Sequence, residues 1–271
     1  MPYPIIDSHC HLDFPKFNPD REEAILRARK AGIIGMVNSG ISLKGNRISL
    51  ELAEKNEDIH AALGLSPDIG REGSDKDIDA ILAQIEANAG KAVAIGEAGL
   101  DFQDCKTNEE REKQTASFKK VIELAKELDK TLVVHARLAE AEVLELVRDV
   151  DNVIYHCYSG SIETMQEIVD SGYYISLATL VCFSEHHQTL AAEVPLENLL
   201  LETDSPFLSP RRGRNEPAFI VDSIPLLYLP LARSQRGWAR AFPSQRVGLL
   251  MDHRLCHSIH PPFFSGCRPH P

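Results

Sequence analysis

Two histidines separated by one residue stand near the start of the chain, in the segment IIDSHCHLD at residues 5–13. Two apolar residues open this segment, which indicates a short buried strand that runs into polar chemistry. Side chains at positions i and i+2 of a strand point to the same side, so the rings of His9 and His11 are expected to converge. Neutral imidazole is the commonest metal ligand in proteins, and this pair could begin a metal site. Taken alone, the pair fits a structural role equally well.

Four further polar side chains stand at the ends of other apolar segments: Glu97, His135, His156 and Asp204. Mixed imidazole and carboxylate ligands favour Zn²⁺, Mn²⁺, Fe²⁺ or Co²⁺ over an all-oxygen Ca²⁺ site. Four histidines and two carboxylates exceed the needs of one tetrahedral ion. They fit two ions about 3.5–4 Å apart that share a bridging carboxylate, a pair that acidifies bound water and stabilises a hydrolytic transition state. The residue types therefore predict a metal-dependent hydrolase.

Short apolar segments alternate with amphipathic ones along the chain and must position these residues. After the opening strand we expect strands near 33–40, 60–67, 92–97, 131–135, 152–156, 173–177 and 199–204, and helices near 20–31, 48–56, 75–88, 108–128, 139–147, 162–169 and 185–193. About eight such units predict a (β/α)8 TIM barrel, in which the carboxyl ends of the strands gather on one face. An open doubly wound sheet is the alternative, but no GxGxxG turn follows the first strand.

Composition narrows the classes of function. The chain has 271 residues, 43% hydrophobic and 25% charged, which suits one barrel of about 250 residues. Its formal net charge of −11 argues against a protein that coats nucleic acid, although an enzyme acting on one phosphodiester could rely on metal ions and a few arginines. The six cysteines form no CxxC pair, no apolar run approaches about 20 residues, and no signal segment opens the chain. We expect a cytoplasmic protein with no membrane association.

Six segments, taken together, resemble the TatD-related metal-dependent deoxyribonucleases, a family of amidohydrolase-like barrels. They are IDSHCHLD (6–13), GEAGLD (96–101), HAR (135–137), HCYSG (156–160), ETDSP (202–206) and RNEP (214–217). The resemblance implies a TIM-barrel hydrolase that cleaves phosphodiester bonds of DNA, often as a 3′-to-5′ exonuclease. It also implies two divalent metal ions as cofactors, with Zn²⁺, Mg²⁺ and Mn²⁺ as candidates, and DNA as the partner.

The resemblance further implies a role for each candidate residue. One ion would be held by His9, His11, Glu97 and Asp204, and the second by Glu97, His135 and His156, which makes Glu97 the bridge. Glu97 and Asp204 are the candidate catalytic residues. Glu97 would bridge the two ions, and Asp204 could also orient or deprotonate the attacking water. Four arginines are candidates for binding the substrate phosphate: Arg137, Arg211, Arg212 and Arg214. A structural salt bridge at Arg137 and a solvated loop at 211–214 are the alternatives.

Two features depart from the family pattern. The segment GLSP (64–67) has Ser66 where the family usually has histidine, which affects the expected orientation of substrate. From residue 225 the chain becomes rich in arginine, histidine and proline, and beyond Asp222 its only acidic residue is Asp252. We therefore expect a barrel domain over 1–224 and an atypical tail over 225–271 that is frame-altered or unrelated and packs poorly. A genuine lineage-specific tail is the alternative.

Two other functions stay open at this point. Related barrels use the same metal pair to hydrolyse an amide or ester of a small molecule, and a non-catalytic metal-binding or nucleic-acid-binding protein is a third possibility. The arginine loop at 211–214 favours a phosphate substrate over an amide or ester. The presence of all six ligand positions argues against a non-catalytic protein.

Overall fold

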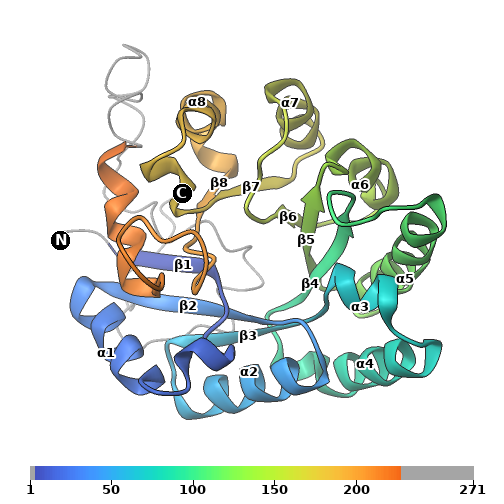
Figure 1. The fold of residues 1–271 in the computed structure, drawn as a ribbon, viewed down its shortest axis with the longest axis horizontal. Coiled ribbons are helices and arrows are strands. Elements are labelled where there is room, and N and C mark those ends of the chain that lie inside the picture. The colour runs from blue at the N-terminus through green and yellow to red at the C-terminus, as the bar shows by residue number, and fades with distance from the viewer. Residues whose placement is uncertain (1–3, 227–271) are drawn as a thin grey trace, which may run out of the picture.

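The computed structural model of the protein describes residues 4–226. Eight parallel strands, paired in chain order, form one nearly closed barrel, and helices surround it (Figure 1). The predicted TIM barrel is therefore confirmed. The tail predicted at 225–271 lies outside the described residues from position 227 onward.

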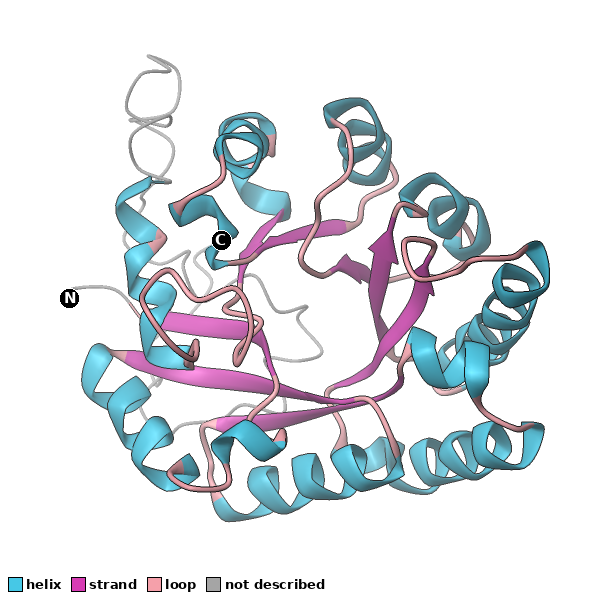
Figure 2. Ribbon diagram, viewed as in Figure 1, coloured by secondary structure: helices cyan, strands magenta, loops and turns pink. Residues whose placement is uncertain are grey.

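Every strand pairs with its neighbours in sequence. The strands are β1 (Ile5–Cys10), β2 (Ile33–Gly40), β3 (Ile59–Leu65), β4 (Ala94–Asp101), β5 (Thr131–Arg137), β6 (Val153–Tyr155), β7 (Tyr174–Leu177) and β8 (Leu199–Leu201). The α-helices are α1 (Arg21–Ala31), α2 (Leu43–Lys55), α3 (Pro67–Glu72), α4 (Asp75–Asn88), α5 (Asn108–Glu127), α6 (Glu140–Val147), α7 (Ile162–Asp170) and α8 (Glu185–Glu193). Short 3-10 helices are η1 (Pro15–Phe17), η2 (Ala89–Lys91), η3 (Thr179–Cys182), η4 (Leu196–Asn198) and η5 (Pro217–Asp222). Figure 2 shows the helices as an outer ring around the strands.

The seam between the first and last strands is held just beyond the end of β8. The Asp204 N–H donates to the His9 carbonyl at 3.0 Å, and the His11 N–H donates to the Ser205 carbonyl at 2.7 Å. These two bonds join the segments that carry three of the predicted metal ligands. The seam therefore brings together residues that are almost 200 positions apart.

Local sequence explains the longer helices. Ser74 and Thr107 begin α4 and α5 with capping boxes, in which the side chains of Asp77 and Glu110 return a hydrogen bond to the cap. The buried residues of α4 include Ile78, Ile81 and Ile85, at the spacing of one helix face. That face packs into the main apolar cluster between the helices and the sheet.

The barrel separates its apolar residues into layers. The two larger clusters combine strand and helix residues and fill the space between the sheet and the outer ring. The buried members of a third cluster come from four consecutive strands: Val37, Ala62, Ala94 and Val133. Because no helix contributes to this cluster, we assign it to the inside of the barrel, as expected for a packed barrel core.

Several predicted boundaries were wrong. Helix α2 begins at Leu43 instead of 48, because Ser42 caps it by accepting a bond from the Gly45 N–H. Helix α3 was not predicted at all: Ser66 caps it, and Pro67 occupies its first turn. Ser66, at the position where a histidine was expected, therefore has a local structural role.

Candidate metal centre

All six predicted ligands converge at the carboxyl-terminal face of the barrel. His9 Nε2 and His11 Nε2 are 3.1 Å apart, and both lie within 3.8 Å of Asp204 Oδ1. His135 Nδ1 and His156 Nε2 form a second pair, also 3.1 Å apart. The His9 and His156 rings stack with centroids 4.1 Å apart, which joins the two groups into one cluster.

Glu97 lies between the two groups of histidines. Its Oε2 atom is 3.3 Å from His9 Nε2 and 3.4 Å from His11 Nε2. Its Oε1 atom is 2.9 Å from His135 Nδ1 and 3.2 Å from His156 Nε2. Each carboxylate oxygen thus faces a separate pair of imidazoles.

A bulge in β4 sets the position of Glu97. The expectation that Glu97 ends its strand was wrong, because β4 continues to Asp101. In the pairing with β5, Ile95 and Ala98 face Leu132 and Val134, so β4 holds one extra residue at this point. The backbone of β3 comes close here: a Cβ on Gly64 would lie 2.2 Å from the Glu97 carbonyl. A strand bulge beside a glycine therefore aims this carboxylate into the cluster.

Polar neighbours fix the orientation of the rings. His11 Nδ1 lies 2.7 Å from the Ser39 carbonyl, which is the geometry of an N–H donating to that oxygen. His9 Nδ1 lies 3.2 Å from the Ser39 hydroxyl. His135 Nε2 lies 3.2 Å from Asp101 Oδ2, so Asp101 contacts a ligand as well as holding its own loop. These partners leave the opposite ring nitrogens free to bind a cation, which is how histidine ligands are usually oriented.

Two buried carboxylates stand behind the cluster. Glu202 is fully buried, with Oε1 3.4 Å from His156 Nδ1, and neither of its oxygens has a hydrogen-bond partner among the described residues. The sequence analysis missed Glu202, although it lies two residues before Asp204. Asp7 accepts hydrogen bonds from Thr203 and from the His9 N–H, so it orients the backbone next to two predicted ligands. Burial raises the pKa of Asp7 to about 8 despite these bonds.

The pKa shifts within the cluster favour the binding of a cation. Burial alone would raise the pKa of Glu97, but His156, His11 and His135 hold it well below its usual value. Burial and the neighbouring His156 lower the pKa of His9. Burial would also lower the pKa of His156, but Glu97 and Glu202 raise it well above its ordinary value. The carboxylate is therefore ionised and His9 neutral, and a bound cation would replace protons on the other rings.

The donor set fits divalent metal ions. Imidazole nitrogens converge on ionised carboxylates, and two overlapping triplets bring their ligand atoms within 4.8 Å of one another. One triplet is His9, Glu97 and His156, and the other is His9, His11 and Asp204. Both imidazole and carboxylate ligands suit transition metals.

The four predicted substrate-binding arginines have different surroundings. Arg137 is half-exposed, with Nη1 3.9 Å from Asp101 Oδ2. Arg212 is exposed and makes no ion pair with any described residue. Arg211 pairs with Asp222 through two bonds of 2.7 Å. The structure thus gathers only Arg137 directly beside the ligands.

Arg214 belongs to an ion-pair network under the loop. It donates to Asp20 at 2.6 and 2.9 Å and lies over the Phe17 ring. Glu216 accepts a bidentate pair from Arg27 of α1. Arg214 and Glu216 thus bind Asp20, which directly precedes α1, and Arg27 within α1. These ion pairs fix the loop against the barrel.

His187 has a position that its sequence did not reveal. The ring is buried in α8. Its Nε2 lies 3.0 Å from Ser159 Oγ, in the loop that follows His156, and its Nδ1 lies 2.8 Å from Ser184 Oγ. Burial lowers the pKa of His187 to about 4, so the ring is neutral at pH 7. It therefore ties α8 to a loop at the metal centre.

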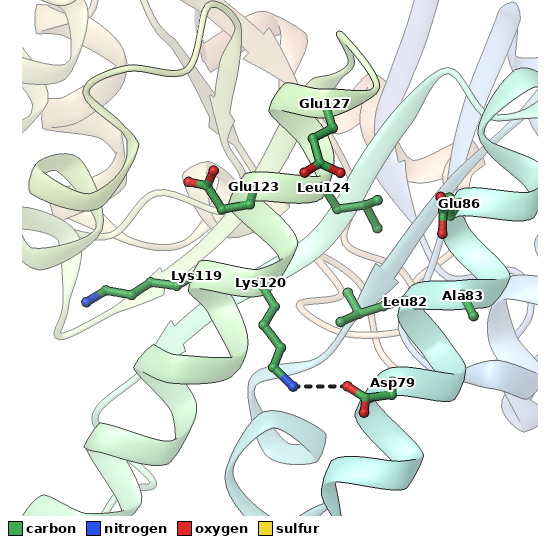
Figure 3. Close-up of a pocket in the computed structure, with 9 residues that line it drawn as sticks. All are labelled: Asp79, Leu82, Ala83, Glu86, Lys119, Lys120, Glu123, Leu124 and Glu127. Carbon is green, nitrogen blue, oxygen red and sulfur yellow. Dashed lines mark hydrogen bonds and ion pairs between the residues drawn. The ribbon is translucent and has the colours of Figure 1, made fainter.

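A groove on the outer surface lies apart from these ligands. It runs between α4 and α5, where Leu82 and Leu124 line it and Lys120 pairs with Asp79 across it (Figure 3). Its lining contains no histidine, and it faces away from the strand ends. We assign it no role in the chemistry. Among the described residues no helix is long and apolar enough to cross a membrane.

Comparison with known proteins agrees with this geometry. The chain is 43% identical, over 78% of its length and 83% of the relative's, to an uncharacterized metal-dependent hydrolase of Methanocaldococcus jannaschii. It is 33% identical to the 3′-5′ ssDNA/RNA exonuclease TatD of Salmonella typhimurium, over 80% of this chain and 87% of that protein. The crystal structure of YjjV, a TatD homologue from Escherichia coli, superposes with a TM-score of 0.75 at 29% identity, covering 83% of this chain and 90% of that one.

The family assignment extends over most of the chain. The sequence profile described as TatD related DNase matches residues 6–232, a range that includes all six ligands and the four arginines. The chain therefore belongs to the TatD-related DNase family and is a metal-dependent hydrolase.

Proposed function

We propose that this chain hydrolyses phosphodiester bonds at the ends of DNA, as a 3′-to-5′ exodeoxyribonuclease with two divalent ions. The observation that carries the proposal is the position of Glu97, whose two oxygens face separate histidine pairs at 2.9–3.4 Å. A carboxylate with this environment is a natural bridge between two ions. The exonuclease activity named for the Salmonella relative supports the choice of substrate.

The proposed ligand sets share that carboxylate. His9, His11, Glu97 and Asp204 hold one ion, and Glu97, His135 and His156 hold the other. When bound, such ions lower the pKa of water and neutralise charge that develops on a phosphoryl group. The candidate metals are Zn²⁺, Mg²⁺ and Mn²⁺, and the four imidazoles favour a transition metal in at least one position.

The side chains then orient the substrate and move the proton. Asp204 is the catalytic residue that accepts the proton of the attacking water, because its carboxylate is ionised and stands at the mouth of the cluster. Arg137 contacts a phosphate oxygen, since its exposed guanidinium group lies beside Asp101 at the cluster, and the exposed Arg212 is the second candidate because no described residue forms an ion pair with it. Arg211 and Arg214 would contact phosphate only after releasing Asp222 and Asp20.

The test removes metals with a chelator and restores Mg²⁺, Mn²⁺ or Zn²⁺ one at a time. Each sample receives single-stranded DNA labelled at one end, and wild type is compared with Glu97→Gln and with Glu86→Gln. Glu86 is an exposed residue of α4 and serves as the matched control. We expect metal-dependent shortening from the 3′ end with wild type and Glu86→Gln, and a loss of at least about 100-fold with Glu97→Gln.

Three outcomes would contradict the proposal. Full activity in Glu97→Gln would exclude this carboxylate as a bridge. No cleavage with any metal, together with turnover of a small amide or ester, would replace the nuclease by the alternative hydrolase. Metal binding without turnover of either substrate class would indicate a non-catalytic protein.

A further inference from the structure

Exposed large apolar side chains concentrate on the face of the barrel that carries the ligands. Seven such side chains are exposed among the described residues. Five of them stand in segments that follow the carboxyl end of a strand: Leu43, Leu138, Ile162, Phe183 and Phe207. Single exposed apolar residues are normal on protein surfaces, whereas a concentration of them on one face marks a binding surface.

Phe207 belongs to the same turn as a predicted metal ligand. Its N–H donates to the Asp204 carbonyl at 2.9 Å. Asn215 Nδ2 donates at 2.8 Å to the carbonyl of the residue before Asp204, and Thr179 Oγ1 donates at 2.7 Å to the carbonyl of the residue after Phe207. The ring is 40% exposed although its backbone is held on both sides. An apolar ring fixed in this way is available to a ligand at little conformational cost.

A second aromatic ring extends this surface towards the metal centre. The Phe14 and Phe207 rings lie with centroids 5.5 Å apart, and together we name them the aromatic platform. The His11 ring is 4.9 Å from Phe14 and 6.3 Å from Phe207. Lys16 Nζ stands 5.1 Å from the centre of the Phe207 ring. Ring surface, a cation and a metal ligand are therefore adjacent.

We propose that the aromatic platform binds the nucleobase beside the phosphodiester that is cleaved, with Lys16 contacting the adjoining phosphate. The inference rests on the proposed nuclease function and specifies its substrate. Stacking of bases on aromatic side chains, assisted by local cations, is the usual way to bind single strands without reading sequence. A base inside a duplex is already stacked and offers no free face. The platform therefore selects an unpaired end.

The charge of the chain supports this assignment. The formal net charge of −11 argues against binding that depends on a general attraction between the protein and a phosphate backbone. Among the described residues, the exposed cations with contacts that place them near the ligands are Lys16, beside Phe207, and Arg137, beside Asp101. Stacking on the platform therefore provides a large share of the binding energy for the terminal nucleotide.

The test compares two single-stranded oligonucleotides that differ only in the terminal nucleotide, which carries either a base or a hydrogen in place of the base. Wild type should cleave the base-bearing end with a kcat/KM about 5- to 150-fold higher, the range that one stacked base contributes. Phe207→Leu should bring this ratio close to one, and Phe207→Trp should keep it. Leu26→Ala, which removes an exposed apolar residue of α1 away from this face, should also keep the wild-type ratio.

A binding measurement separates this inference from the proposed function. An oligonucleotide with terminal 2-aminopurine and a non-hydrolysable methylene-bridged last linkage should lose fluorescence on wild type, because stacking quenches the base, and should stay brighter on Phe207→Leu. Equal fluorescence on both proteins, or an equal cleavage ratio in both, would overturn the platform. If wild type cleaves neither oligonucleotide, the nuclease proposal fails, and the fluorescence alone decides for or against the platform.

Discussion

Glu202 gives the sharpest test of how the protein prepares its metal centre. Its carboxylate is fully buried, and its nearest ionic partner is His156 Nδ1 at 3.4 Å. An acceptor behind a histidine ligand fixes the ring and makes it a stronger ligand, and losing such an acceptor typically lowers metal affinity about 10- to 100-fold. We therefore expect substitutions of Glu202 to weaken metal binding, although this residue contacts no ion in the proposed ligand sets.

The expected magnitude can be graded by substitution. The 10- to 100-fold effect of losing a carboxylate behind a histidine ligand corresponds to about 1.4–2.7 kcal/mol. Glu202→Gln keeps an acceptor but loses the charge, which predicts a loss of about 1–1.5 kcal/mol, or about tenfold in metal affinity. Glu202→Leu removes the acceptor entirely and should cost about 2–3 kcal/mol, or about 30- to 150-fold. The prediction therefore includes an order: Glu202→Leu should lower metal affinity more than Glu202→Gln does.

The assay measures metal affinity and stability separately. Metal-free protein competes with a coloured chelator for Zn²⁺, and the melting temperature of the metal-free protein is recorded for each variant. Glu197→Gln, an exposed change in η4, is the matched control and should behave as wild type. Without metal the two Glu202 variants should lose stability, because each removes one carboxylate partner of the buried His156 ring. Wild-type Zn²⁺ affinity in both variants would refute this reasoning.

Three further changes test other parts of the structure. Burial lowers the pKa of His187 to about 4. Between pH 6.5 and pH 4 the unfolded chain therefore binds a proton at this ring and the native state does not. The free energy of unfolding should fall with decreasing pH across this window by at most about 3 kcal/mol. His187→Asn should flatten that part of a urea-unfolding series against pH; an unaltered slope would contradict the assignment. Gly64→Ala would push a Cβ against the Glu97 carbonyl, and it should lower the free energy of unfolding by about 1–3 kcal/mol and weaken Zn²⁺ binding. Gly90→Ala is the control: Gly90 has open space around it, so this change should affect neither quantity. Glu216→Gln should lower stability by about 1 kcal/mol at low salt and less at 1 M salt, and an equal loss at both would show that the ion pair is not responsible.

The sequence predicted that the six candidate residues would converge, because a parallel barrel converts chain order into position. His135 and His156 each follow an apolar segment, and in a barrel such residues meet on one face. The identity of the neighbours behind them depended on contacts across the chain. In the sequence, Glu202 directly follows three leucines of the last strand, a position that does not reveal its neighbours. The fold shows that its carboxylate lies behind His156.

The position of Glu97 was predicted for an incomplete reason. A strand ending at this residue was expected, yet β4 continues and a bulge turns the side chain inward. The backbone at the bulge passes so close to Gly64 of the neighbouring strand that any larger residue there would meet the Glu97 backbone. A glycine that is required by another strand cannot be distinguished from an ordinary glycine by local pattern, because the requirement arises only when the strands pair.

The acidic character of the cluster constrains how an anionic substrate can enter. Apart from Asp7, whose pKa of about 8 keeps it protonated at pH 7, four carboxylates stand in or directly behind it: Glu97, Asp101, Glu202 and Asp204. Without metal ions, protons on His11 and His156 offset only part of this negative charge, and the remainder would repel a phosphodiester in a site where burial leaves little water to screen it. Two divalent ions, as proposed, would balance the four negative charges, and the exposed Lys16 and Arg137 would then give this face a net attraction for phosphate. Metal binding must therefore precede substrate binding, and the aromatic platform can hold a base productively only after the ions are in place.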